Sequence, residues 1–365
     1  MEAQVVEEKA KVNLEKKPRF FRRGFNAVFE LSGESAVVFK GLVKHLAGEF
    51  FGKRYYGADA LTVGFELDGL AVRVMDSGRV KLADVKLNKR DFDEFSVNPY
   101  KRWRLPELPA YVGLPMNELL YALESVSKDA RVRFSVVGVY KCRSYVETKT
   151  FRVPEVCPKC GRQTHPAFNA LPADKRGKDG RSFKCSNCGW RGKVREKTRK
   201  VRVWRCDMDR DSCEVVVEVV EGDRCERFAL TVFEPEVLEA SLPKIPVSVT
   251  AKLALKDFYA VLDRLGKKCE TVKVEASSDG LTLHGKGDFV KAEFPIKRGS
   301  DMLLDIKAKG KTTATYKVDE LKACLPRLGD IATISFSENM PIKTEINTLL
   351  ANSTVSFWLA PVTQS

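Results

Sequence analysis

The sequence has few of the residues on which enzyme active sites depend. Its 365 residues include only three histidines, His45, His165 and His284, and none stands in a recognisable catalytic triad or carboxylate constellation. It also lacks a glycine motif that would cradle phosphates, because Gly285-Lys-Gly287 is typical of a hairpin turn. An enzyme is therefore the least expected class of protein, and we predict no catalytic residues.

Long hydrophobic runs are absent as well. No stretch of about 18 apolar residues occurs, so we expect neither a membrane span nor a membrane partner. Residues 1–25 mix Glu and Lys without an apolar segment, which argues against a secretory signal and predicts a flexible tail. We expect the protein in the cytoplasm, associated with the nucleoid, in a prokaryote, or in the nucleus of a eukaryote.

Acidic residues are scarce in one part of the chain. Between Lys149 and Arg205 there are 17 Lys and Arg but only four Asp and Glu, whereas the chain as a whole carries a net charge of +14. Nearly all the excess charge therefore belongs to this stretch. A basic module on a nearly neutral scaffold favours a surface that faces phosphates, and the alternative is a solubilising surface.

The same stretch contains two Cys-x-x-Cys pairs, Cys157-Pro-Lys-Cys160 and Cys185-Ser-Asn-Cys188, each followed by a glycine. Four thiolates at this spacing are typical of a tetrahedral, structural Zn²⁺ site with no open position for water. We therefore predict a zinc ribbon over residues 154–196. His165 is an alternative ligand, and a redox role for one pair is the lesser alternative.

The remaining six cysteines are scattered without a framework. They are Cys142, Cys206, Cys213, Cys225, Cys269 and Cys324. We expect them to be buried apolar residues, since disulfides inside cells are typical only of hyperthermophiles.

The flanks of the ribbon, Val146–Val153 and Val194–Trp204, look strand-like and predict one hairpin whose tip is replaced by the ribbon. Zinc would supply the folding energy that so small a module cannot obtain from its core. Candidate DNA contacts here are Arg195, Lys197 and Arg199, with Phe183 and Trp190 as stacking surfaces. The alternatives are a partner-binding module and a rigid spacer.

An internal repeat divides the chain. Met116–Ser135 matches Val318–Ser337 without gaps, and each copy reads as a short helix followed by an alternating strand. A second pair of amphipathic helices carries Phe39, Val43 and Leu46 in one copy and Phe258, Leu262 and Leu265 in the other. Each half of the chain thus contains two short helices separated by strands.

The repeat predicts an α+β protein of two similar domains, each with sheets and two short helices. The first domain covers residues 26–233 and is interrupted by the zinc ribbon. A connector follows at 234–247, where Pro235, Pro243 and Pro246 disfavour regular structure. The second domain covers residues 248–365.

Several motifs resemble the PCNA family of DNA sliding clamps, especially its archaeal members. They are Met75-Asp-Ser-Gly-Arg-Val80, Leu82-Ala-Asp-Val-Lys-Leu87, Lys273-Val-Glu-Ala-Ser-Ser-Asp-Gly-Leu281, Asn339-Met-Pro-Ile-Lys343 and Phe357-Trp-Leu-Ala-Pro361. The resemblance implies a ring, usually a homotrimer, that encircles double-stranded DNA as a processivity factor. It also implies that the helices line the DNA channel and that the protein has no catalytic chemistry.

The resemblance assigns two surfaces by position. Candidate DNA contacts on the helices are Lys40, Lys44, Arg264, Lys267, Lys268, Lys322 and Arg327. The pocket for short peptide motifs of a DNA polymerase, clamp loader, ligase or nuclease would comprise Met75, Leu238, Leu242, Pro341, Trp358, Ala360 and Pro361. Subunits would join by pairing Glu226–Phe233 of one chain with Leu281–Asp288 of another.

A different class of protein also fits the zinc ribbon and the charge. It is a zinc-ribbon nucleic-acid-binding protein, such as a transcription or RNA-processing factor, that forms no ring. Such a protein would bind linear DNA well, whereas a clamp would slide off its ends.

Overall fold

The computed structural model describes residues 20–362 except 51–59, 77, 102, 107, 152–156, 158, 162–181, 185–186, 194–196, 237–241, 244 and 349. The chain divides into two compact units. The main unit consists of residues 23–140 and 208–365, and the inserted unit consists of residues 1–22 and 141–207. No helix in the described part of the chain is long and apolar enough to cross a membrane.

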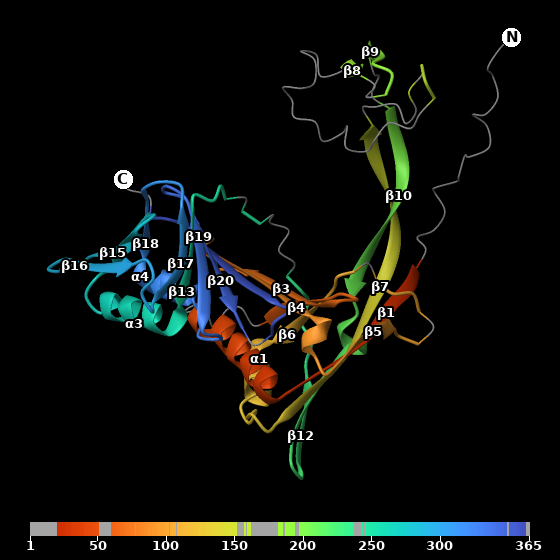
Figure 1. Cartoon of the computed structure of the whole chain (residues 1–365). Coiled ribbons are helices and arrows are strands. Elements are labelled where there is room, and N and C mark those ends of the chain that lie inside the picture. Colours follow the sequence, from red (N-terminus) through yellow and green to blue (C-terminus); the bar gives the residue numbers. More distant parts are fainter. Residues whose placement is uncertain are drawn as a thin grey trace. The chain divides into compact units, whose positions relative to one another are not determined.

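The main unit contains two copies of one order of elements (Figure 1). The first copy is β1 (Phe20–Ser32), α1 (Gly33–His45), β2 (Ala60–Phe65), β3 (Gly69–Met75), β4 (Lys81–Asn88), β5 (Glu94–Pro99), β6 (Ala110–Pro115), α2 (Met116–Ala122), β7 (Arg131–Phe151), β11 (Glu214–Glu221) and β12 (Arg224–Leu230). The second is β13 (Val249–Ala254), α3 (Leu255–Gly266), β14 (Thr271–Ser277), β15 (Gly280–Lys286), β16 (Lys291–Lys297), β17 (Leu303–Ala308), β18 (Thr312–Lys317), α4 (Val318–Ala323), β19 (Ile331–Phe336), β20 (Ile342–Asn347) and β21 (Thr354–Leu359). The predicted α+β repeat is confirmed.

The strands form three larger sheets. A nine-stranded sheet has the order β17-β13-β19-β20-β21-β4-β3-β2-β6, so it takes five strands from the second copy and four from the first. The other strands form β12-β11-β7-β1-β5 and β16-β15-β14-β18. In the picture α1 and α3 lie along the same side of the nine-stranded sheet (Figure 1).

The helices form because their apolar residues recur on one side. In α1, Ala36, Phe39, Leu42 and Val43 are buried, as the predicted spacing requires. Phe39 lies edge-on to Phe134 of β7, with the ring centroids 5.6 Å apart. Burying one such ring stabilises the fold by about 1.5–3 kcal/mol.

A polar contact sits where the two copies meet. Nζ of Lys81 in β4 lies 2.5 Å from Oε2 of Glu320 in α4, and the lysine side chain is 6% exposed. A second polar contact joins the copies, since Nε2 of His45 in α1 lies 2.8 Å from the carbonyl oxygen of Ala323 in α4. Together with the β21–β4 ladder, these contacts join the two halves of the chain into one unit.

The inserted unit contains the far part of β7, β8 (Ser182–Lys184), β9 (Arg191–Lys193) and β10 (Lys197–Met208). β10 pairs with β7, as predicted for the hairpin, and β8 pairs with β9. The inserted unit covers 141–207, more than the predicted 154–196, because it also includes the paired segments of β7 and β10.

The predictions for the N-terminal tail and for Cys142 and Cys206 differ from the structure. β1 begins at Phe20, so residues 20–25 of the predicted flexible tail are strand, and the ring of Phe21 packs edge-on against Trp204 at 4.7 Å. Cys142 and Cys206 form a disulfide rather than separate apolar sites, because strand pairing brings them to a Cα–Cα distance of 4.0 Å. Residues 1–19 lie outside the described part.

Candidate nucleic-acid interface, partner pocket and metal centre

Two of the predicted DNA contacts are already engaged within the protein. Nζ of Lys40 donates to the carbonyl oxygens of Glu124 and Val126 at 2.6 and 3.0 Å, and so ties α1 to the turn after α2. Nζ of Lys322 donates to Oδ1 of Asp263 at 2.9 Å and is 19% exposed. This hydrogen bond, together with the lysine charge, holds the pKa of Asp263 below its ordinary value.

The other predicted helix contacts keep their charge at the surface. Lys44 is exposed on α1. The guanidinium of Arg264 lies 5.6 Å from the Phe294 ring centroid, and that of Arg327 lies 3.9 Å from the Tyr259 ring centroid. Such cation–π contacts orient a guanidinium without neutralising it, so both groups remain able to bind phosphate.

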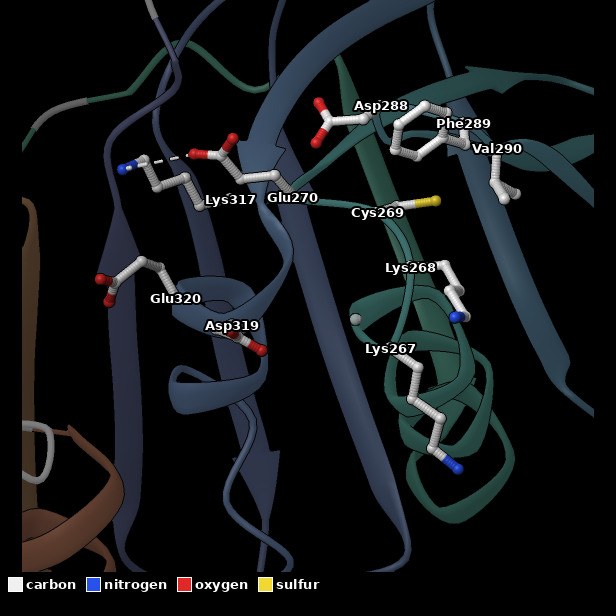
Figure 2. A pocket seen from close by; sticks show the side chains of 11 residues that line it. Lys267, Lys268, Cys269, Glu270, Asp288, Phe289, Val290, Lys317, Asp319 and Glu320 are labelled. Atoms are coloured by element: carbon white, nitrogen blue, oxygen red, sulfur yellow. Dashed lines mark ion pairs between the residues drawn. The ribbon is translucent and has the colours of Figure 1, made fainter.

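Lys267 and Lys268 lie on the rim of a cavity of about 620 Å³ at the end of α3 (Figure 2). The cavity is also lined by carboxylates, those of Glu270, Asp288, Asp319 and Glu320. In Figure 2 the Lys267 side chain points away from Glu270, whose carboxylate instead lies 4.0 Å from Nζ of Lys317. The mixed charge makes the cavity itself a poor phosphate site, which leaves the outward lysines as the candidate contacts.

The predicted partner pocket falls largely on neighbouring strands. Leu82 of β4 pairs with both Met75 of β3 and Trp358 of β21, which aligns these three residues across the sheet. Ala360 follows β21 directly, and its N–H donates to the carbonyl oxygen of Val80 at 2.9 Å. Pro361 comes next in the chain, while Pro341 immediately precedes β20.

The remaining two residues of the predicted partner pocket, Leu238 and Leu242, belong to the connector and not to these strands. Leu242 is half-buried, and Leu238 lies outside the described residues. Two apolar residues near the predicted set but not part of it, Val80 and Met340, are 38% and 39% exposed. Their place inside the quoted motifs, beside Met75 and Pro341, is the signal that could have found them.

Three of the four predicted zinc ligands meet in space. The sulfur atoms of Cys157, Cys160 and Cys188 lie within 4.8 Å of one another, and Cys185 lies outside the described residues. The sulfurs of Cys157 and Cys188 are 3.7 Å apart. A tetrahedral site with Zn–S bonds of about 2.3 Å requires sulfurs about 3.8 Å apart, so the donor set fits zinc.

The glycines that follow the two cysteine pairs have the backbone conformation of tight turns. Gly161 and Gly189 have φ of 67° and 69°, in the left-handed region that favours glycine. The N–H of Gly161 donates to the carbonyl oxygen of Cys157 at 2.9 Å, which closes the first turn. Of the predicted DNA contacts near the ribbon, Lys197 and Arg199 belong to β10, and Arg195 lies outside the described residues.

Of the two segments predicted to pair between subunits, one lies at the end of a sheet and the other does not. β12, which overlaps the predicted 226–233, lies at the end of its sheet. The prediction for 281–288 is wrong, because β15 lies between β14 and β16, and β16 is the edge strand. The resemblance implies the strand before the true edge, whereas Pro295 in β16 is a residue typical of an edge strand.

Comparison with known proteins agrees with this architecture. No protein-family model matches the chain. It is 26% identical over 140 residues to a DNA polymerase sliding clamp of Cenarchaeum symbiosum, which covers 37% of this chain and 56% of the relative. The chain thus matches little more than half the length of that curated relative.

Solved structures match over much more of the chain. PCNA from Thermococcus kodakaraensis has a TM-score of 0.60 at 16% identity and covers 92% of this chain and 100% of its own. A chain from the PCNA2-PCNA3 complex of Sulfolobus tokodaii has a TM-score of 0.59 at 16% identity and covers 92% and 98%. The chain therefore has the sliding-clamp fold.

Proposed function

We propose that this protein is a DNA sliding clamp, a processivity factor that closes as a homotrimeric ring around duplex DNA. It would tether a DNA polymerase, clamp loader, ligase or nuclease through short peptides bound beside Met75 and Trp358. The observation that carries the proposal is an interrupted sheet. One nine-stranded sheet is complete within the chain. The strands that could form a second one are divided between two separate sheets.

The two sheets have matching parts. In the complete sheet, β21 of the second copy pairs with β4 of the first, which joins five strands to four. The equivalents of these strands are β12, which ends the row β12-β11-β7-β1-β5, and β16, which ends a sheet of four strands. β10 of the inserted unit pairs with β7 and lies outside that row of five. Pairing β12 of one molecule with β16 of the next would rebuild the nine-stranded sheet and remove both open edges. Repeated head to tail, this contact produces a ring if its rotation closes.

The free edges carry apolar side chains that suit such a contact. Tyr121 of α2 is 67% exposed and packs edge-on against Phe228 of β12, with ring centroids 5.8 Å apart. At the turn before β16, Phe289 is 99% exposed and Val290 is 39% exposed. Covering Phe289 and Tyr121 in a subunit contact would remove two large apolar groups from water.

The helix residues suit weak contacts with DNA of any sequence. Lys44, Arg264, Lys267, Lys268 and Arg327 are exposed cations on or just after α1, α3 and α4. Lysine and arginine reach phosphates without reading bases, which allows the ring to slide. Topological linkage, rather than tight binding, would keep the ring on DNA.

The inserted unit adds a structural zinc site held by Cys157, Cys160, Cys185 and Cys188. When bound, zinc would fold the tip of the insertion and supply no open position for catalysis. We predict that Cys157→Ser/Cys185→Ser removes one zinc per chain, measured by metal analysis, and leaves the oligomeric mass unchanged. Loss of the trimer in this variant would contradict a separable insertion.

Retention on DNA circles tests the proposed function. A ring loaded on a circular plasmid should stay bound during gel filtration and should be lost after the plasmid is linearised. The alternative function, a zinc-ribbon transcription or RNA-processing factor without a ring, predicts equal retention on both forms.

A further inference from the structure

Positive charge is concentrated on the paired strands of the inserted unit and not only at its cysteine-bearing tip. The segments 141–151 of β7 and 197–207 of β10 together contain eight Lys and Arg but only two Asp and Glu. A two-stranded ladder needs no such excess to form, and repulsion between like charges weakens it.

The disulfide aligns these strands. Because Cys142 faces Cys206, the adjacent positions Arg143 and Arg205 also face each other across the ladder. Their side chains are 58% and 68% exposed. Both guanidinium groups contact one carboxylate, that of Asp207, at 4.0 Å from Arg143 and 3.3 Å from Arg205. One carboxylate cannot neutralise two guanidinium groups, so positive charge remains at this position.

The two faces of the ladder differ. Since side chains alternate along a strand, Arg143 and Tyr145 share one face of β7, and Tyr145 is 47% exposed. Cys206 and Trp204 belong to the opposite face of β10, where Trp204 packs against Phe21. One face thus carries the disulfide and the aromatic packing, while the other presents arginines and a tyrosine to solvent.

We propose that the face carrying Arg143, Tyr145 and Arg205 binds the phosphate backbone of duplex DNA as a grip separate from the clamp helices. This inference rests on the proposed function, which places duplex DNA beside the protein. Arginine pairs with phosphate through two parallel hydrogen bonds, and the tyrosine hydroxyl can donate to another phosphate oxygen. A two-stranded ribbon also fits the major groove, which is about 12 Å wide.

The test measures binding of the full chain to a short, labelled linear duplex by fluorescence anisotropy over a range of salt concentrations. In Arg143→Gln/Arg205→Gln we expect weaker binding and a log–log salt slope shallower by about 1.8, because each lost phosphate contact removes about 0.9. The matched control is Lys89→Gln/Arg90→Gln, which removes two exposed cations assigned to no site. The control should keep the slope of the unaltered protein.

An unchanged slope in the arginine variant would overturn the inference. So would normal DNA binding combined with lost binding of a polyglutamate probe, which would assign the face to an acidic protein partner. The mass and circle retention of the same proteins are measured in parallel. If the protein forms a ring but the arginine variant keeps the salt slope of the unaltered protein, only this inference is wrong. If the protein is a single subunit but the arginine variant has a shallower salt slope, only the proposed function is wrong.

Discussion

Lys40 illustrates how a basic helix residue can serve the fold rather than DNA. Lys40 and Lys44 of α1 are both among the predicted DNA contacts. The structure separates them, because Lys40 donates to the carbonyl oxygens of Glu124 and Val126 while Lys44 is exposed. Sequence periodicity identifies the apolar side of a helix, but it does not show which polar groups lie within reach of a neighbouring element.

We therefore predict different effects for two matched substitutions in α1. Lys40→Met should lower the free energy of unfolding by about 1–3 kcal/mol, because two carbonyl oxygens lose a charged donor. Lys44→Met should change stability by less than about 0.5 kcal/mol, as is usual for exposed sites. Urea unfolding of both variants checks this. Equal stability of the two variants would contradict the structural role of Lys40.

The cysteines show what residue spacing can and cannot reveal. The two Cys-x-x-Cys pairs predict a metal site because the two cysteines of each pair are close in the sequence. In the structure three of the four sulfur atoms lie close together. Cys142 and Cys206 are separated by 64 positions and belong to no motif. Only the pairing of β7 with β10 brings them together, so their disulfide could not be predicted from the sequence.

At the scale of elements, the helices and the repeat were predictable, but strand order was not. A hydrophobic period of two identifies β15 and β16 equally well, and only hydrogen bonding places β16 at the edge. Pro295 is the residue that could have identified β16 as the edge strand, since a proline within a strand is tolerated at an edge.

The free edge of β12 provides a test of the proposed subunit contact. The two-residue turn at Gly222–Asp223 pairs Glu221 with Arg224, so the N–H of Arg227 points away from β11 toward the open edge. Arg227→Pro should lower the oligomeric mass, measured by light scattering, while the subunit stays folded by circular dichroism. The control Arg227→Gln keeps the N–H and should keep the mass. Unaltered assembly of the proline variant would rule out pairing through β12.

The disulfide should stabilise the ladder of the inserted unit. A two-stranded ladder alone is marginally stable in water, and a covalent link restricts its unfolded states. Cys142→Ser/Cys206→Ser should therefore speed amide hydrogen exchange in 143–151 and 197–205 without changing exchange in β13–β21. Equal protection with and without the link would show that strand pairing suffices.

At the scale of the whole molecule, the sliding-clamp fold follows from the repeat, whose two copies share one order of elements. The edges of the two copies differ in whether they are paired within the chain. Lys81 and Glu320 form an ion pair between the copies within the chain, whereas Phe289 and Tyr121 remain exposed beside the open edges. In the proposed ring, β12 and β16 of neighbouring molecules would pair as β21 and β4 pair within the chain.

Molecular mass in solution tests ring assembly most directly. Light scattering at several protein concentrations should give three times the chain mass of 41.0 kDa, and the value should hold as the protein is diluted over the micromolar range. A mass of one chain throughout that range would contradict the account, because β12 and β16 would then remain unpaired.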